Sequence, residues 1–189
     1  MYRITGNYAD GEPVRYESLV SQATHMGAWL LPRGIAMMEQ LYPSEYSLGE
    51  EYAFCSGLIK MRTPVVFHSS ISYVVRVHAS QTRLSATRSM ERYRDQLRLI
   101  QESVANLIDS EVQLTADGRR SIAENCWAKG RHAIRIGLHD IGRAYIDYAL
   151  LVDPALKPIG SMPYRKLTQM MGPVRAEHIL EFLKRRFER

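Results

Sequence analysis

The sequence predicts an α+β chain that is mostly helical, in which a mixed region over residues 1–82 precedes an all-helical tail over residues 83–189. Two short runs rich in β-branched residues, Val65–Phe67 and Ile71–Val77, predict strands and occur only before Gln81. From about Ser85 onward, apolar side chains recur at steps of three and four, which is typical of helices with one buried face. The chain therefore changes character near Gln81, and we place a domain boundary between residues 82 and 83.

Within the mixed region, turn and helix signals punctuate the chain. The turn sequence Ala9-Asp10-Gly11 predicts a hairpin from Tyr2 to Val14. A short helix is expected over Gly34–Leu41, because Tyr42-Pro43 closes it. A second helix is expected after Ser47, which can cap it with Glu50 as its capping-box partner, and it ends before Pro64.

The tail begins with a long predicted helix over about Ser85–Ile108, which ends before the Asp117-Gly118 break. Its apolar positions form one stripe, and charged side chains such as Arg88 and Glu91 fall on the other face. The stripe consists of Met90, Tyr93, Leu97, Ile100, Val104 and Leu107. We expect this stripe to be buried.

A helical hairpin is predicted from Arg119 to Pro154. Gly137 ends the first helix at the usual C-terminal position, and Asp153-Pro154 closes the second. The small residues Gly130 and Ala144, with Gly137 between them, resemble one tetratricopeptide-type unit, although stacking needs about three units. The residues expected to line the hairpin are Ile122, Cys126, Ala133, Ile136, Ile141, Ala144, Tyr145, Tyr148 and Leu151.

Two shorter helices complete the predicted tail. Ser161 is expected to cap the first of them, with Pro163 in its first turn. Pro173 is expected to open the last helix. That helix is predicted to bury Ile179, Leu180, Leu183 and Phe187.

Composition and charge indicate an ordinary globular protein. Hydrophobic residues make up 46% and charged residues 24% of the chain, and no apolar run approaches the roughly 20 residues that span a bilayer. The net charge of +5 is concentrated near the C-terminus, and no aromatic-interleaved basic strand or zinc-finger spacing indicates nucleic-acid binding. With no signal peptide and two widely spaced cysteines, Cys55 and Cys126, we expect a reduced cytoplasmic location, with a membrane-peripheral position as the alternative.

The most informative segment runs from Trp29 to Thr82. It contains Gly49-Glu50-Glu51-Tyr52 and, about twenty residues later, Tyr73-Val74-Val75-Arg76-Val77-His78-Ala79-Ser80-Gln81-Thr82. An acidic pair followed by an Arg-x-His segment resembles the second half of the catalytic domain of family 2 glycosyltransferases, which has the GT-A fold. The tail also resembles the tails of bacterial members, because it contains the stretch Ala149-Leu150-x-x-Asp153-Pro154. The resemblance implies transfer of a sugar from a nucleotide sugar, as in the synthesis of cell-surface polysaccharides.

The resemblance implies a catalytic role for the acidic pair. An inverting transfer needs a carboxylate to take the proton of the acceptor hydroxyl. By position that residue is Glu51, with Glu50 beside it. The family commonly has Glu-Asp, so the Glu-Glu of this chain moves the carboxylate by about one methylene group, and geometry matters on that scale. The alternative is that both are first-turn acids favoured by the helix dipole.

Three further residues are candidates by the same resemblance. His78 corresponds to a histidine that helps to hold the divalent metal on the donor diphosphate, and Arg76 alternates with it on one strand and suits phosphate. The alternative for His78 is an ordinary half-buried histidine. Trp29 is either a sugar platform of the substrate site or a core residue.

The metal-binding and nucleotide-binding half of that fold has no counterpart in the sequence. No Asp-x-Asp motif, glycine-rich phosphate loop or Rossmann fingerprint occurs in the chain. We therefore expect Mn²⁺ or Mg²⁺, nucleotide sugar and acceptor to bind only when a missing N-terminal half is supplied. The alternative functions are a helical protein-interaction module or partner subunit without catalysis, and an unrelated helical binding protein.

Overall fold

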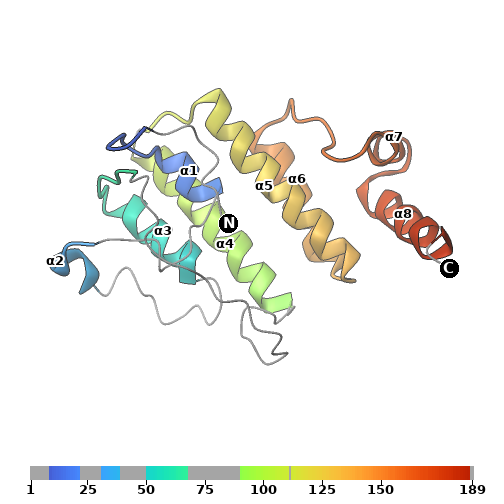
Figure 1. Cartoon of the computed structure of the whole chain (residues 1–189), viewed down its shortest axis with the longest axis horizontal. Coiled ribbons are helices and arrows are strands. Elements are labelled where there is room, and N and C mark those ends of the chain that lie inside the picture. The colour runs from blue at the N-terminus through green and yellow to red at the C-terminus, as the bar shows by residue number, and fades with distance from the viewer. Residues whose placement is uncertain (1–8, 22–30, 39–49, 68–89, 111, 188–189) are drawn as a thin grey trace. The chain divides into compact units, whose positions relative to one another are not determined.

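A computed structural model describes residues 9–21, 31–38, 50–67, 90–110 and 112–187. These residues are mostly helical, which confirms the coarse prediction, and they belong to two compact units that divide after Thr115 (Figure 1). The predicted boundary between residues 82 and 83 lies outside the described residues. No helix in the described ranges has both the length and the apolar character needed to cross a bilayer.

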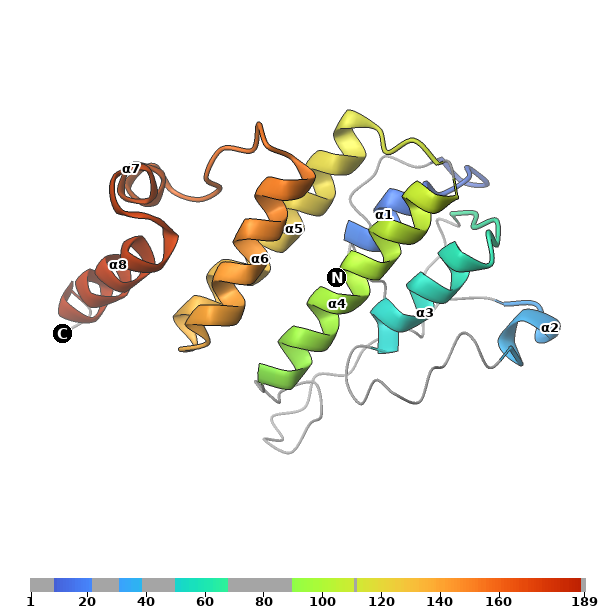
Figure 2. The same cartoon turned by 180° about the vertical axis from the view of Figure 1, so that it is seen from behind.

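The first unit contains α1 (Tyr16–Ser21), α2 (Arg33–Ala36), α3 (Glu50–Lys60) and α4 (Met90–Asp109). Helices α3 and α4 lie side by side, and α1 packs against both of them (Figures 1 and 2). Their C-terminal ends lie close together, because Arg62, just after α3, donates a hydrogen bond from Nη2 to the carbonyl oxygen of Ser110, just after α4, at 3.3 Å. The two helices therefore run in the same direction.

The stripe predicted for the long helix is the part of α4 that forms the core of this unit. Five residues of the stripe are buried, which confirms the period of the pattern: Tyr93, Leu97, Ile100, Val104 and Leu107. Met90 was expected in the stripe but is 49% exposed, so that prediction is wrong. As the first residue of α4 it instead accepts a hydrogen bond at its sulfur from Arg94 Nη2, 3.2 Å away.

Extended pairing among the described residues is limited to an antiparallel bridge between Pro13 and Val66. The amide of Val14 donates a hydrogen bond to the carbonyl oxygen of Val65 at 2.8 Å. The amide of Phe67 donates one to the carbonyl oxygen of Glu12 at 2.9 Å. Within the described residues, the predicted strand Val65–Phe67 therefore takes part in this bridge alone. The first arm of the predicted hairpin and the strand Ile71–Val77 lie outside the described residues.

The short helices of the first unit differ from the sequence prediction. Helix α1 was not predicted, because six residues are too few to establish a period. Helix α2 begins at Arg33 and already reaches its C-cap at Met37, so it is shorter than the predicted Gly34–Leu41. Ser47, the predicted cap of the next helix, lies outside the described residues.

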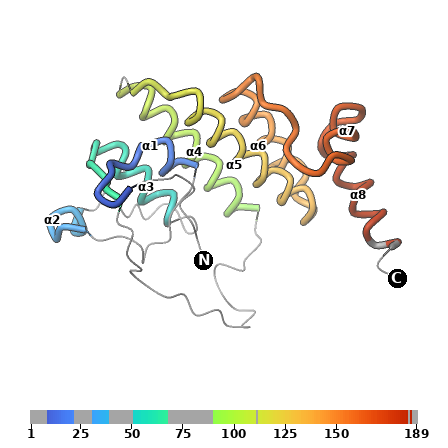
Figure 3. Tube along the Cα trace, turned by 45° about the horizontal axis from the view of Figure 1, so that its top comes forward, coloured from blue at the N-terminus to red at the C-terminus, as the bar shows by residue number. Residues whose placement is uncertain are grey.

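The second unit begins with a hairpin of α5 (Ala116–Arg135) and α6 (His139–Val152), as predicted (Figure 3). Gly137 in the turn has φ +89°, a left-handed conformation that favours glycine. The helices touch at Gly130 and Gly142, where an added Cβ on either residue would lie 2.7 Å from the other's carbonyl oxygen. Gly142, which the sequence analysis did not single out, is therefore with Gly130 a small residue that permits close packing.

The remaining helices are α7 (Met162–Met171) and α8 (Pro173–Phe187), and α8 packs against α5, α6 and α7. Ser161 holds the N-cap position of α7, but its side chain makes no capping hydrogen bond, contrary to the prediction. Two predicted core residues are exposed, Leu151 at 74% and Leu183 at 38%. Both lie near the ends of their helices, and α8 instead buries Ala176 and Glu177.

Candidate functional site

The acidic pair lies at the start of α3. Glu50 is the first helical residue and Glu51 the second, and the side chain of Glu51 is half-buried. Every residue from Tyr52 to Ile59 is buried, so the body of α3 is held firmly within the first unit. The unbonded amides and the dipole of the first turn favour a carboxylate at this position.

This arrangement suits a fixed proton acceptor. A carboxylate on a helix whose body is fully packed has little freedom to shift, and catalytic groups work best on such rigid elements. Because Glu51 keeps part of its side chain open to solvent, an acceptor hydroxyl could approach it. The side chain of Glu50 lies outside the described part of the structure.

The other predicted site residues, Trp29, Arg76 and His78, all lie outside the described residues. The structure therefore neither brings them to Glu51 nor separates them from it, and their roles stay predictions. Among the residues described, no three His, Cys, Asp or Glu side chains gather in a way that could hold a metal ion.

Sequence reasoning missed a buried carboxylate in the first unit. Glu17, in α1, is 5% exposed and accepts hydrogen bonds at Oε1 from the amide and the hydroxyl of Thr115, at 3.1 and 3.2 Å. The Tyr16 hydroxyl donates to the carbonyl oxygen of Thr63 at 3.1 Å, and burial raises its pKa. These bonds tie the loop after α3 and the segment after α4 to α1, so they anchor the unit that carries Glu51.

A second missed feature is the ion-pair cluster around Glu177 in α8, which is also nearly fully buried. Arg131 Nε donates to Glu177 Oε1, and Arg135 forms an ion pair with the same carboxylate, its Nε lying 3.2 Å from Oε2. Arg131 also donates from Nη1 to the carbonyl oxygen of Ile159 at 2.8 Å, and its guanidinium lies 3.6 Å from the ring centroid of Tyr164. Both carboxylate oxygens are thus paired, and the cluster has a structural role, holding α8 and α7 against α5.

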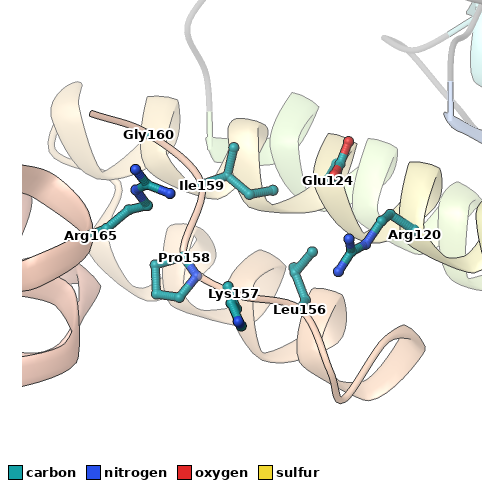
Figure 4. Close-up of a pocket in the computed structure, with 8 residues that line it drawn as sticks. All are labelled: Arg120, Glu124, Leu156, Lys157, Pro158, Ile159, Gly160 and Arg165. Carbon is teal, nitrogen blue, oxygen red and sulfur yellow. The ribbon is translucent and has the colours of Figure 1, made fainter. Parts of the chain in front are cut away.

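A surface pocket of about 270 Å³ lies in the second unit (Figure 4). Its cationic members are Arg120, Lys157 and Arg165, with Glu124 as the acidic one. Arg120 is also paired with Asp153, whose Oδ2 lies 3.3 Å from Nε. None of these residues was a predicted site residue.

The two cysteines are structural. Cys55 and Cys126 are both buried, as expected, and neither forms a disulfide. Burial raises the pKa of the Cys126 thiol to about 12, so it stays protonated near neutral pH. A thiol in that state is a poor nucleophile and a poor metal ligand.

Comparison of the chain with protein-family models, with curated proteins and with solved structures found no match. The resemblance to family 2 glycosyltransferases therefore rests on the acidic pair, on the Arg-x-His segment and on their spacing.

Proposed function

We propose that this chain is the acceptor-side portion of an inverting, nucleotide-sugar-dependent glycosyltransferase of family 2, with Glu51 as the general base. The observation that carries the proposal is the position of Glu51, half-exposed in the first turn of a helix whose next eight residues are buried. In the family that the sequence resembles, the acidic pair opens a helix beneath the acceptor. The start of α3 at Glu50 agrees with that arrangement.

The chemistry assigned to Glu51 is one proton transfer. As the acceptor hydroxyl oxygen forms its bond to the anomeric carbon, the bond from that carbon to the donor diphosphate breaks, and Glu51 takes the hydroxyl proton. Attack on the face opposite the leaving group inverts the anomeric centre. A positioned base of this kind contributes about 10²–10⁴-fold to the rate.

The donor side requires parts from elsewhere. The sequence has no Asp-x-Asp motif, and among the described residues no group of three or more His, Cys, Asp or Glu side chains gathers to hold the metal of the donor. Under the proposal, His78 and Arg76 face the donor diphosphate, Trp29 contacts a sugar, and a nucleotide-binding half completes the enzyme.

The test uses the chain together with a nucleotide-binding half supplied in cis or as a second chain, and measures release of nucleoside diphosphate from a nucleotide sugar. Glu51→Gln should lower turnover by about 10²-fold or more while donor binding is retained, because it removes a proton acceptor and little volume. Glu91→Gln is the matched control, since Glu91 is an exposed first-turn acid of α4. His78→Ala should weaken metal-dependent donor binding instead. Full turnover by the Glu51→Gln enzyme would refute the assigned base.

A second candidate is a helical interaction module without catalysis, and large exposed apolar side chains in the second unit favour it. They include Leu151 in α6, Met170 in α7 and Phe182 in α8. The combined change Leu151→Ser and Phe182→Ser separates the two functions. If the chain is part of a transferase, the double variant should keep the turnover of the completed enzyme. If the chain is an interaction module, wild type should show no turnover with any nucleotide sugar, and the double variant should lose binding to the protein partner.

A further inference from the structure

Two histidines that are far apart in the sequence meet on the surface of the second unit. His139 is the first residue of α6, and His178 lies in α8, 39 residues later. Their Nε2 atoms are 2.9 Å apart, and both side chains are exposed. The ring centroids are 4.6 Å apart, and the ring planes cross at 67°.

We propose that His139 and His178 form a binding site for a divalent transition-metal ion, of the Cu²⁺ or Ni²⁺ type, which links α6 to α8. Neutral imidazole is the commonest protein ligand for such ions. The site does not depend on the proposed transferase function, and it involves none of the residues assigned to that reaction.

The separation of the two nitrogens fits one coordination geometry in particular. With metal–nitrogen bonds of about 2.0–2.1 Å, two ligands at a right angle lie about 2.9 Å apart, and two at the tetrahedral angle lie about 3.3 Å apart. The observed 2.9 Å is the length of the hydrogen bond between the two rings, and it is closer to the right-angle separation than to the tetrahedral one. Right angles belong to the square-planar and tetragonal sites that Cu²⁺ and Ni²⁺ prefer, whereas Zn²⁺ prefers a tetrahedron.

The orientation of the rings agrees with this geometry. If the two rings lay end to end along the line between their Nε2 atoms, their centroids would be farther apart than the observed 4.6 Å. At least one ring is therefore tilted away from that line, which is compatible with two ligands of one ion. In a hydrogen-bonded pair one ring donates its Nε2 proton to the other, and for metal binding that ring shifts the proton to Nδ1, so that both Nε2 lone pairs reach the ion.

The surroundings leave room for the rest of the coordination shell. Both histidines are exposed, and among the described residues no third His, Cys, Asp or Glu completes a cluster with them. Water would fill the remaining positions. Because the ligands come from two helices, a bound ion would stabilise the packing of α8 on α6.

The experiment titrates the full chain, after dialysis against a chelator, with Cu²⁺ and Ni²⁺ in a calorimeter. We expect one site of the highest affinity, with nitrogen hyperfine structure from two imidazoles in the electron paramagnetic resonance spectrum of the Cu²⁺ form. His139→Gln and His178→Gln should each weaken that site by at least tenfold and leave a single coupled imidazole. His132→Gln, at an exposed histidine of α5, is the matched control and should bind like wild type.

A second measurement protects the test against variants that fold poorly. Ni²⁺ should raise the melting temperature of wild type and of the His132→Gln control by several degrees, and it should not raise that of either pair variant. His78→Ala should retain this shift, which separates the pair from the donor metal proposed for the transferase. The proposal is overturned if both pair variants keep the wild-type affinity, or if the His132→Gln control loses it to the same extent.

Discussion

Replacing Gly142 by alanine tests how closely α5 and α6 must approach each other. The new Cβ would lie 2.7 Å from the carbonyl oxygen of Gly130 and 3.0 Å from the amide nitrogen of Ile134. It would also lie 2.6 Å from Ile134 Cγ1. A side chain can rotate away, but two backbone atoms cannot, so the substitution must push the helices apart.

The cost follows from the distance that the helices must move. Ordinary contact begins at 3.4 Å, so relieving the 2.7 Å contact requires a separation of about 0.7 Å. A gap of that size forfeits roughly a quarter to a half of the dispersion attraction between facing atoms. Over the buried hairpin interface this is comparable to a core truncation of about 3–5 kcal/mol, and the better helix propensity of alanine returns about 1 kcal/mol. We expect a net loss of about 2–4 kcal/mol in the free energy of unfolding.

The assay is chemical denaturation followed by circular dichroism. Gly34→Ala is the control, because a Cβ at Gly34 meets nothing within 4 Å, and it should be neutral or slightly stabilising. The double variant of Gly130 and Gly142 should lose less than the sum of the two single losses, since one separation accommodates both methyl groups. Wild-type stability of Gly142→Ala, or strict additivity, would refute close backbone packing at this position.

Two further predictions concern buried side chains. Ile100→Ala should destabilise the first unit by about 2–5 kcal/mol, because Ile100 is fully buried in α4, while the exposed Gln101→Ala should change its thermal melt little. Cys126 should react slowly with a thiol reagent at neutral pH in the folded chain and rapidly in denaturant. Because burial raises its pKa from 9.0 to about 12, the unfolded state loses the thiol proton first as the pH rises. The buried neutral thiol therefore makes its full contribution to the free energy of unfolding below about pH 9, and this contribution is lost progressively toward pH 12. Its upper bound is about 4 kcal/mol, at about 1.4 kcal/mol for each unit by which the pKa is raised. In denaturation at a series of alkaline pH values, Cys126→Ala should fall less steeply than wild type, and equal slopes would contradict the assignment.

Local patterns predicted the helices that bury one face. The spacing of apolar residues located α4, and Gly137 located the turn between α5 and α6. Both signals act over a few residues, since a helical period and a left-handed glycine are properties of the local chain. The same patterns failed at helix ends, where Met90 and Leu151 continue the period but the packing does not reach them.

Contacts between distant residues could not be predicted in this way. Glu17 and Thr115 are separated by 98 residues, and Arg131 and Glu177 by 46. In the sequence alone, nothing distinguishes any of these residues from an ordinary charged or polar side chain. Their partnership depends on which helices come to lie together, which no single-sequence pattern encodes.

The sequence by itself determined the helical character of the tail, the position of the hairpin and the choice of Glu51 as the candidate base. The tertiary structure decided that Glu51 stands on a helix with a fully buried body, that Gly142 is the small residue at the helix crossing, and that His139 meets His178. The physical reason is range: propensity, periodicity and capping act within a few turns of one helix. Burial, ion pairing and ligand geometry instead arise only when segments tens of residues apart are packed against one another.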